Sequence, residues 1–319
     1  MQTLLWSLIL VASVWAAHWG SDRLAEPLEK LRRQWGLSEA AGAAFVALAT
    51  ASPEVGTNTA AALRGLSDIG LGNLLGSNII SVPAIVLVSY LASRNIGDSN
   101  YVEVKTEALN VQAIPYIIII ILAAILTVPA PWRGLQPVDG WIMLAAYLVY
   151  LAQAILRERQ SGNEVRWQKG EILEAIAGAL GLAIAAYFIV TATERLVTLL
   201  EISQIIGGLF ITSTLSIAPE VFATWNVAKS GQVTAATTSV IADNTATMTL
   251  ALFPLALVSL QIQDFRLFTV NLIFVTLLAI AYAAFIRWGK QKNSFELWEV
   301  LTLIAIYLSY LAIMIFVIL

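Results

Sequence analysis

The stretch TASPE at residues 50–54 places a proline and a carboxylate inside an apolar segment that spans residues 37–63. Proline has no N–H and clashes with the carbonyl four residues earlier, so Pro53 is expected to release a backbone oxygen near Ala49 or Thr50. Broken backbone of this kind is stable at membrane depth only where it is buried in protein or lines a cavity. The stretch therefore predicts an interrupted membrane helix with a functional role.

The same arrangement recurs once, as SIAPE at residues 216–220. The offset of 166 residues continues beyond the two motifs, because Gly65 pairs with Gly231 and Ser81 pairs with Thr247. A register shared over more than thirty positions indicates two related halves, each built around one helix break that carries a glutamate.

The composition identifies the surroundings of the chain. It has 319 residues, of which 59% are hydrophobic and 12% charged, and a mean hydropathy of +0.79. This is too little polar surface for a soluble globule, so we expect a multi-pass protein of the lipid bilayer. The absence of cysteine excludes thiolate chemistry, and the single histidine, His18, excludes a histidine metal cluster. Nothing in the net charge of −3 indicates nucleic-acid binding, and no obligate protein partner is expected.

About 20 apolar residues are needed to cross the hydrocarbon core, and the sequence contains ten such spans. They cover residues 4–19, 37–63, 69–92, 111–128, 138–155, 172–197, 205–228, 233–260, 267–286 and 297–319. Five is an odd number, so the second half must cross the membrane in the opposite sense to the first. The expected fold is all-α, with ten transmembrane helices in two inverted five-helix repeats, as in secondary transporters.

The expected boundaries follow from this count. Residues 1–156 form the first repeat with its motif at 49–81, residues 157–170 form a cytoplasmic linker, and residues 171–319 form the second repeat with its motif at 215–247. Between the first two spans, the polar segment 22–35 predicts an interfacial helix that is broken at Pro27.

Basic residues predict the orientation, because Lys and Arg accumulate in cytoplasmic loops. Loops after the odd-numbered spans hold 14 of the 18 basic residues: Arg23, Lys30, Arg32, Arg33, Arg94, Lys105, Arg157, Arg159, Arg166, Lys169, Lys229, Arg287, Lys290 and Lys292. Both termini are therefore expected on the extracytoplasmic side. The lack of cysteine and of a long regulatory loop favours the inner (plasma) membrane of a prokaryote.

The third span carries a polar stripe, formed by Asn73, Ser77 and Ser81 at four-residue spacing on one helix face. In the second half the matching face holds Ser239, Asp243 and Thr247. A carboxylate at the depth of Asp243 costs a few kcal/mol on insertion scales and indicates function. The alternative is that a neutral aspartic acid joins two helices by a hydrogen bond.

Carboxylate, hydroxyl and amide oxygens are hard ligands that suit a hard cation. The candidate cation ligands are Glu54, Glu220, Asp243, Thr50, Ser216, Ser77, Ser81, Thr247, Asn73 and Ser52. For the two glutamates the alternative is a pair of protonated structural carboxyls, and for the hydroxyls it is satisfaction of freed backbone groups.

These residues resemble the cation/calcium antiporter superfamily, which includes the membrane domain of sodium/calcium exchangers. Its two alpha repeats read approximately G-T-S-x-P-E and G-N-x-x-G-S-N. The first repeat here reads ATASPE at 49–54 and GNLLGSN at 72–78, which is a close match. The second reads LSIAPE at 215–220 and TSVIADN at 238–244, which is a looser one.

The resemblance implies cation sites between the second, third, seventh and eighth spans, with Glu54 and Glu220 as calcium ligands. It also implies that Thr50 and Ser216 supply backbone oxygens, that Ser77 is a sodium ligand, and that the first and sixth spans form a sliding gate.

The sequence departs from the family pattern at five positions. Ala51 and Ile217 replace the serine of the motif, Ser81 and Thr247 stand where Asn or Asp is common, and Asp243 stands where serine is usual. These differences leave the coupling ion open.

The leading functional hypothesis is a secondary antiporter that exchanges Ca²⁺ for Na⁺. In a second reading the exchange is H⁺/Ca²⁺, with Asp243 or a glutamate as the proton carrier. A third is an intramembrane enzyme that binds Mg²⁺, against which stands the absence of a nucleophile–base pair. The fourth is a divergent family member with another cation selectivity. We expect no enzyme activity and no cofactor besides the transported ions.

Overall fold

The computed structural model describes residues 1–37, 46–94, 101–104, 109–129, 133–157, 165, 169–289 and 291–318. Parts of the predicted second span (38–45) and of the predicted linker (158–164 and 166–168) lie outside these residues, as do the loop residues Lys105, Arg159, Arg166 and Lys290.

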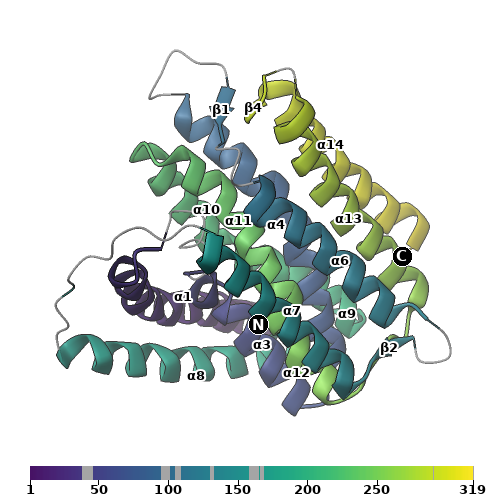
Figure 1. Cartoon of the computed structure of the whole chain (residues 1–319). Helices are drawn as coiled ribbons and strands as arrows, with labels where there is room; N and C mark the ends of the chain where they lie inside the picture. Colours follow the sequence, from purple (N-terminus) through teal and green to yellow (C-terminus); the bar gives the residue numbers. More distant parts are fainter. Residues whose placement is uncertain are drawn as a thin grey trace.

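The described residues form a bundle of helices (Figure 1). The helices of the first half are α1 (Gln2–Gln34), α3 (Ser52–Leu63), α4 (Ser67–Ser93), the π-helix η1 (Leu109–Ala113), α6 (Ile114–Thr127) and α7 (Pro137–Arg157). Those of the second half are α8 (Lys169–Leu200), α9 (Gln204–Ile206), η2 (Gly207–Thr212), α10 (Ser213–Lys229), α11 (Val233–Ala246), η3 (Thr247–Ala251), α12 (Leu252–Leu257), α13 (Phe265–Trp288), α14 (Leu297–Ile313) and η4 (Met314–Ile318).

Two short antiparallel strand pairs join the loops. Strand β1 (Tyr101–Glu103) pairs with β4 (Ser294–Glu296), and β2 (Gly134–Leu135) pairs with β3 (Leu260–Gln261). Each pair connects a loop of the first half to a loop of the second, so the two halves are tied together at the ends of the bundle as well as in its core.

Nine helices or continuous helical runs in the described residues are long and apolar enough to cross a membrane. Residues 46–50 are helical and α3 follows after a turn at Ala51, which supplies the remaining span. The chain is therefore an all-α, multi-pass membrane protein, with ten transmembrane helices arranged as two inverted five-helix repeats. This confirms the fold class predicted from the sequence.

The two halves share backbone detail at the turns that follow α3 and α10. Gly65 and Gly231 both have positive φ, at 69° and 90°, as expected for the glycine that ends a helix in a Schellman turn. In the first turn Leu66 N–H donates to the Ala61 carbonyl, and in the second Gln232 N–H donates to the Val227 carbonyl. Each of these positions is related to its partner by 166 residues.

Helix α1 is longer than predicted. It continues through Pro27 to Gln34, so the predicted break at Pro27 is wrong. A proline removes one backbone hydrogen bond, and contacts between α1 and α8 hold the helix together beyond it. Arg23 forms an ion pair with Glu174 of α8, and Lys30 forms one with Glu171.

Helices α1 and α8 lie together on one side of the bundle, away from α13 and α14 (Figure 1). Their backbones approach closely at Gly20 and Gly178. A Cβ atom added to Gly20 would lie 2.5 Å from the Gly178 carbonyl oxygen, and one added to Gly178 would lie 2.7 Å from the Gly20 carbonyl oxygen. Only glycine allows this separation.

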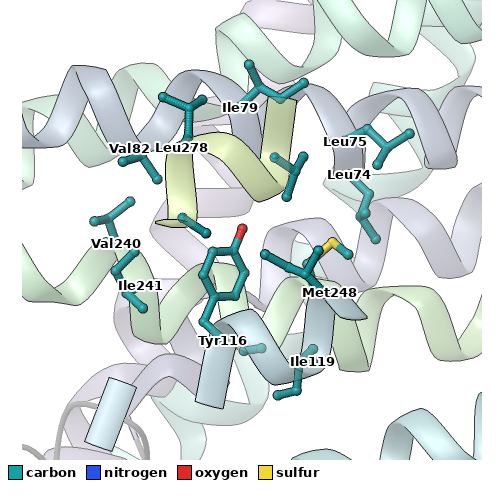
Figure 2. Close-up of a cluster of buried hydrophobic side chains, with 14 of the residues drawn as sticks. Leu74, Leu75, Ile79, Val82, Tyr116, Ile119, Val240, Ile241, Met248 and Leu278 are labelled. Atoms are coloured by element: carbon teal, nitrogen blue, oxygen red, sulfur yellow. The ribbon is translucent and has the colours of Figure 1, made fainter. Parts of the chain in front are cut away.

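The span α4 and the span formed by α11, η3 and α12 are the most buried, at 72% and 78% of their apolar windows. Between them lies a cluster of apolar side chains that includes Leu75, Ile79, Ile241 and Met248. Figure 2 shows Tyr116 of α6 in this cluster, with its hydroxyl directed toward α4. The centre of the protein is thus formed by the spans that carry the polar stripes.

Candidate functional site

The first proline–glutamate motif interrupts its helix. Helical residues 46–50 are followed by a turn at Ala51, and Pro53 lies in the first turn of α3, where its missing N–H has no intrahelical partner to lose. The carbonyl oxygen of Ala49 accepts hydrogen bonds from the hydroxyls of Ser52 and Ser21, both at 2.6 Å. The predicted release of the Ala49 oxygen is therefore confirmed, and that oxygen links the motif to α1.

The second motif is different. Pro219 lies inside α10, which continues without interruption to Lys229, so the predicted break at Pro219 is wrong. The irregular backbone lies about two to three turns earlier, in the π-helix η2. Single π-helical turns inside longer helices are frequent at functional sites, because they shift the register of the following residues. Helix α10 packs along α4, and this packing stabilises it through the proline.

Three carboxylates from the two halves approach one another. Glu54 and Asp243 are 2% and 8% exposed, and Glu220 is partly exposed. Asp243 interacts electrostatically with both glutamates, and Glu220 with Glu54. The Thr50 side chain interacts with the Asp243 carboxyl, and its hydroxyl lies 3.4 Å from the Ala47 carbonyl oxygen.

No Lys or Arg in the described part of the chain forms an ion pair with these carboxylates. One oxygen of Glu54 (Oε2) and one of Asp243 (Oδ1) are buried without a hydrogen-bond partner. An uncompensated buried charge costs several kcal/mol, so such a group requires a cation or a proton. The carboxylates do not form a complete cage by themselves, since the described residues contain no cluster of three acidic or histidine side chains tight enough to hold a metal ion.

A cavity of about 410 Å³ borders this site. Its wall includes Thr50, Glu220, Ser239 and Asp243, and it extends to Glu29 and Arg32 of α1 and to Gln232 at the start of α11. It is therefore open on the side that carries the turn between α10 and α11, which we call the α10–α11 side.

The equivalent positions of the other repeat are closed. Ala223, Thr224 and Ser239 line the cavity. Their equivalents are buried, with Thr57 2% exposed and Asn58 and Asn73 fully buried. Because the repeats are inverted, these residues lie toward the opposite side of the membrane, which carries the turn between α3 and α4 and which we call the α3–α4 side. The site is thus accessible from one side only.

A second polar group joins the two halves next to the carboxylates. Asn78 of α4 donates to the Thr247 hydroxyl at 3.0 Å, and Ser81 of α4 donates to the Asn244 side-chain oxygen, also at 3.0 Å. The two hydrogen bonds are equivalent in the repeats, because Asn78 corresponds to Asn244 and Ser81 to Thr247. Tyr116 completes the group by donating to the Asn78 oxygen at 2.8 Å.

The remaining candidates lie on the same spans without reaching the cavity wall. Asn73 has neither amide atom paired, and the Ser77 hydroxyl donates to the Leu74 carbonyl at 3.1 Å. Ser216 is buried in α10. The structure therefore brings Thr50, Glu220 and Asp243 together at the cavity, with Glu54 close to them. Ser81 and Thr247 lie next to them, in the group that joins the halves.

The family of the chain follows from a comparison with known proteins. Residues 5–156 and 172–316 match the family model described as sodium/calcium exchanger protein. The chain belongs to this family. The exchanger-family chain is also 24% identical over 219 residues to an uncharacterized membrane protein of Methanocaldococcus jannaschii. The matched region covers 66% of the chain and 68% of that protein. It is 37% identical over 75 residues to the sodium/calcium exchanger MaX1 of Methanosarcina acetivorans. This shorter match covers 23% of the chain and 21% of MaX1.

Solved structures share the fold of this exchanger-family chain. The sodium-calcium exchanger NCX_Mj soaked with Na⁺ and Sr²⁺ superposes with a TM-score of 0.67 at 21% identity, covering 97% of this chain and 99% of NCX_Mj. The H⁺/Ca²⁺ exchanger CAX superposes with a TM-score of 0.76 at 15% identity, covering 99% of this chain and 81% of CAX. At these identities the likeness establishes the fold, and it leaves the coupling ion open.

The proline–glutamate motif pointed to Glu54 and Glu220, and the depth of Asp243 in its span pointed to that carboxylate, but two asparagines escaped the sequence-based list of candidates. Asn78 and Asn244 are equivalent by the repeat offset, and each makes a hydrogen bond to the opposite half. Their shared register was the available signal. Asn58 has no such signal, because its repeat equivalent is Thr224.

Proposed function

We propose that the chain is a secondary active antiporter that exchanges Ca²⁺ for Na⁺ by alternating access. The observation that carries this proposal is the group of three carboxylates from both repeats, without a basic partner, beside a cavity that opens on one side only. Carboxylate, hydroxyl and carbonyl oxygens are the ligands that Ca²⁺ and Na⁺ prefer. Family membership and the shared fold with the exchangers NCX_Mj and CAX support it.

The proposed cation sites lie between α3, α4, α10 and α11. Glu54, Glu220 and Asp243 supply the charge. The neutral ligands come from Thr50, Ser216, Ser77, Ser81, Thr247, Asn73 and Ser52. A serine hydroxyl that donates its proton to a carbonyl, as Ser52 does, keeps its lone pairs for a cation.

Charge balance limits the ions that bind together. Three ionised carboxylates carry −3, which three Na⁺ neutralise fully. One Ca²⁺ leaves a residual −1, and desolvation disfavours any occupancy that leaves net charge buried. A proton on one carboxylate removes this residual charge. H⁺/Ca²⁺ exchange, with Asp243 or a glutamate carrying the proton, is therefore the second candidate function. The fold that the chain shares with the H⁺/Ca²⁺ exchanger CAX is a further reason to test it.

The basic residues give the proposed orientation. Lys229 lies at the end of α10 and the basic second half of α1 borders the cavity mouth, so the α10–α11 side is the cytoplasmic side. We place both termini outside the cytoplasm and the protein in the inner membrane of a prokaryote. In this orientation the structure is the inward-open state of the exchanger.

The test is ⁴⁵Ca²⁺ uptake into proteoliposomes loaded with Na⁺, run beside proteoliposomes with only a pH gradient in choline buffer. Glu54→Gln and Glu220→Gln are expected to abolish uptake that depends on internal Na⁺. Asp264→Asn is the matched control, because Asp264 caps α13 through the Leu267 N–H and asparagine preserves that cap.

Each outcome assigns the coupling ion or rejects the substrate. Uptake that follows the pH gradient without Na⁺, and that is lost in Asp243→Asn, identifies H⁺/Ca²⁺ exchange. The absence of ⁴⁵Ca²⁺ uptake under either gradient, in vesicles shown to be sealed, contradicts calcium transport.

A further inference from the structure

On the closed α3–α4 side, a buried hydrogen bond joins α3 of the first half to η3 of the second. The Asn58 side-chain nitrogen of α3 donates to the Ala251 carbonyl oxygen, the last residue of the π-helix η3, at 2.9 Å. Asn58 and Ala251 are both fully buried. This bond fastens the helix of Glu54 to the span of Asp243 on the side where the site is sealed.

The equivalent pair on the open side lies in the wall of the cavity. The repeat offset converts Asn58 into Thr224 and Ala251 into Ile85, and both of these residues line the cavity. The threonine oxygen is one bond from Cβ, whereas the asparagine nitrogen is two bonds away. At the backbone separation that Asn58 bridges, a threonine at the equivalent place does not reach the carbonyl.

A second difference between the repeats acts in the same direction. Gly70 of α4 lies against Asn58, since a Cβ added to Gly70 would lie 3.1 Å from the Asn58 Oδ1 atom, 3.0 Å from Leu255 and 3.3 Å from Ala61. Its repeat equivalent is Ala236, which lines the cavity. The closed side thus has a glycine that permits tight packing, and the open side has a methyl group at the same place.

We propose that Asn58 is a positioning residue for the exchange cycle, whose carboxamide holds the α3–α4 side closed, while Thr224 and Ala236 close the α10–α11 side less firmly. The resting protein therefore favours the state that is open on the α10–α11 side. The proposal rests on the proposed function only for the alternation between two states of access, and it requires no particular transported ion.

Cysteine labelling tests the proposal directly, because the chain has no native cysteine. The reporters are Thr57→Cys and Ala223→Cys, which are equivalent in the two repeats, one closed and one lining the cavity. A membrane-impermeant maleimide is applied from each side of vesicles of known orientation. Ala223→Cys is expected to label from the α10–α11 side, and Thr57→Cys is expected to be protected from both sides.

Adding Asn58→Thr to the Thr57→Cys reporter is expected to raise its labelling from the α3–α4 side about fivefold. This is the change in a two-state equilibrium that the loss of one net hydrogen bond produces. The exchange of both residues, Asn58→Thr with Thr224→Asn, is expected to raise it further. Thr59→Val is the control, because the Thr59 hydroxyl bonds only within its own helix, to the Val55 carbonyl.

Three results overturn the proposal. One is unchanged labelling of Thr57→Cys in the Asn58→Thr variant, and another is an equal rise with Thr59→Val. The third is a rise at Ser89→Cys, a position buried in α4, because that indicates a loosened fold in place of one-sided opening. Since labelling needs no ion flux, a failure to transport calcium leaves this test intact.

Discussion

Asp243→Asn removes one of the three carboxylates while preserving the size of the side chain. In the proposed Na⁺/Ca²⁺ exchange, three Na⁺ balance three carboxylates in the wild-type site, and the return step with one Ca²⁺ carries one charge less. The exchange therefore moves one net positive charge per cycle. With asparagine at 243, Glu54 and Glu220 carry −2, which two Na⁺ or one Ca²⁺ neutralise equally. The variant is expected to exchange ions without net charge movement.

The membrane potential gives the size of the difference. One elementary charge that crosses 100 mV corresponds to about 2.3 kcal/mol, which is about a 50-fold change in the Ca²⁺ ratio that a fixed Na⁺ gradient maintains at equilibrium. For an exchange without net charge the same potential has no effect. Wild type and Asp243→Asn should thus differ by more than one order of magnitude in their response to voltage.

The assay sets the potential of Na⁺-loaded proteoliposomes with a K⁺ gradient and valinomycin, and follows ⁴⁵Ca²⁺ to its plateau. Asp264→Asn serves again as the control and should keep the wild-type response. An equal response of wild type and Asp243→Asn to the potential would refute the reasoning, because it means that the Asp243 carboxylate carries no charge in the exchange.

The remaining predictions concern stability and selectivity. Asn78→Ala removes three buried hydrogen bonds and leaves the Tyr116 hydroxyl unpaired, so we expect a loss of about 2–3 kcal/mol in thermal unfolding in detergent, with the exposed Asn226→Ala as an unaffected control. Gly178→Ala should lower the melting temperature because its Cβ meets α1, whereas Gly170→Ala, with open space around it in the same helix, should raise it slightly; equal effects would contradict the close α1–α8 crossing. A tenfold excess of Mg²⁺ should leave ⁴⁵Ca²⁺ uptake largely unchanged, since Mg²⁺ dehydrates reluctantly, and inhibition as strong as that by unlabelled Ca²⁺ would indicate another selectivity.

The sequence was sufficient for the fold because membrane spans and repeats are written in local patterns. Apolar length identified the spans, and the offset of 166 residues located the matching turns at Gly65 and Gly231. Proline was less informative. Pro53 begins a helix, whereas Pro27 and Pro219 lie inside α1 and α10. A proline costs one hydrogen bond, and packing against a neighbouring helix decides whether the helix continues. A local sequence pattern carries no information about that packing.

The candidate site was predictable to a similar degree. Carboxylates at membrane depth are rare enough to be noticed singly, so Glu54, Glu220 and Asp243 could be named as candidates from the sequence. The hydroxyls were harder, because Ser81 and Thr247 pair with asparagines of the opposite half. Such pairing depends on how the two repeats meet. The bond of Asn58 to Ala251 was invisible for the same reason, since its partner is a backbone carbonyl 193 residues away.

The two glutamates explain why exchange would be obligatory. In this structure Glu220 faces the cavity, where water can solvate it, while its equivalent Glu54 is 2% exposed. In the proposed alternating-access mechanism, inversion of the repeats means that the opposite state buries Glu220 and opens Glu54 to water. Between these states all three carboxylates are enclosed together, and without cations their mutual repulsion adds to a desolvation cost of several kcal/mol each. Bound cations remove both costs. In this mechanism the empty carrier is therefore trapped on one side, and only an exchange of ions returns it to the other.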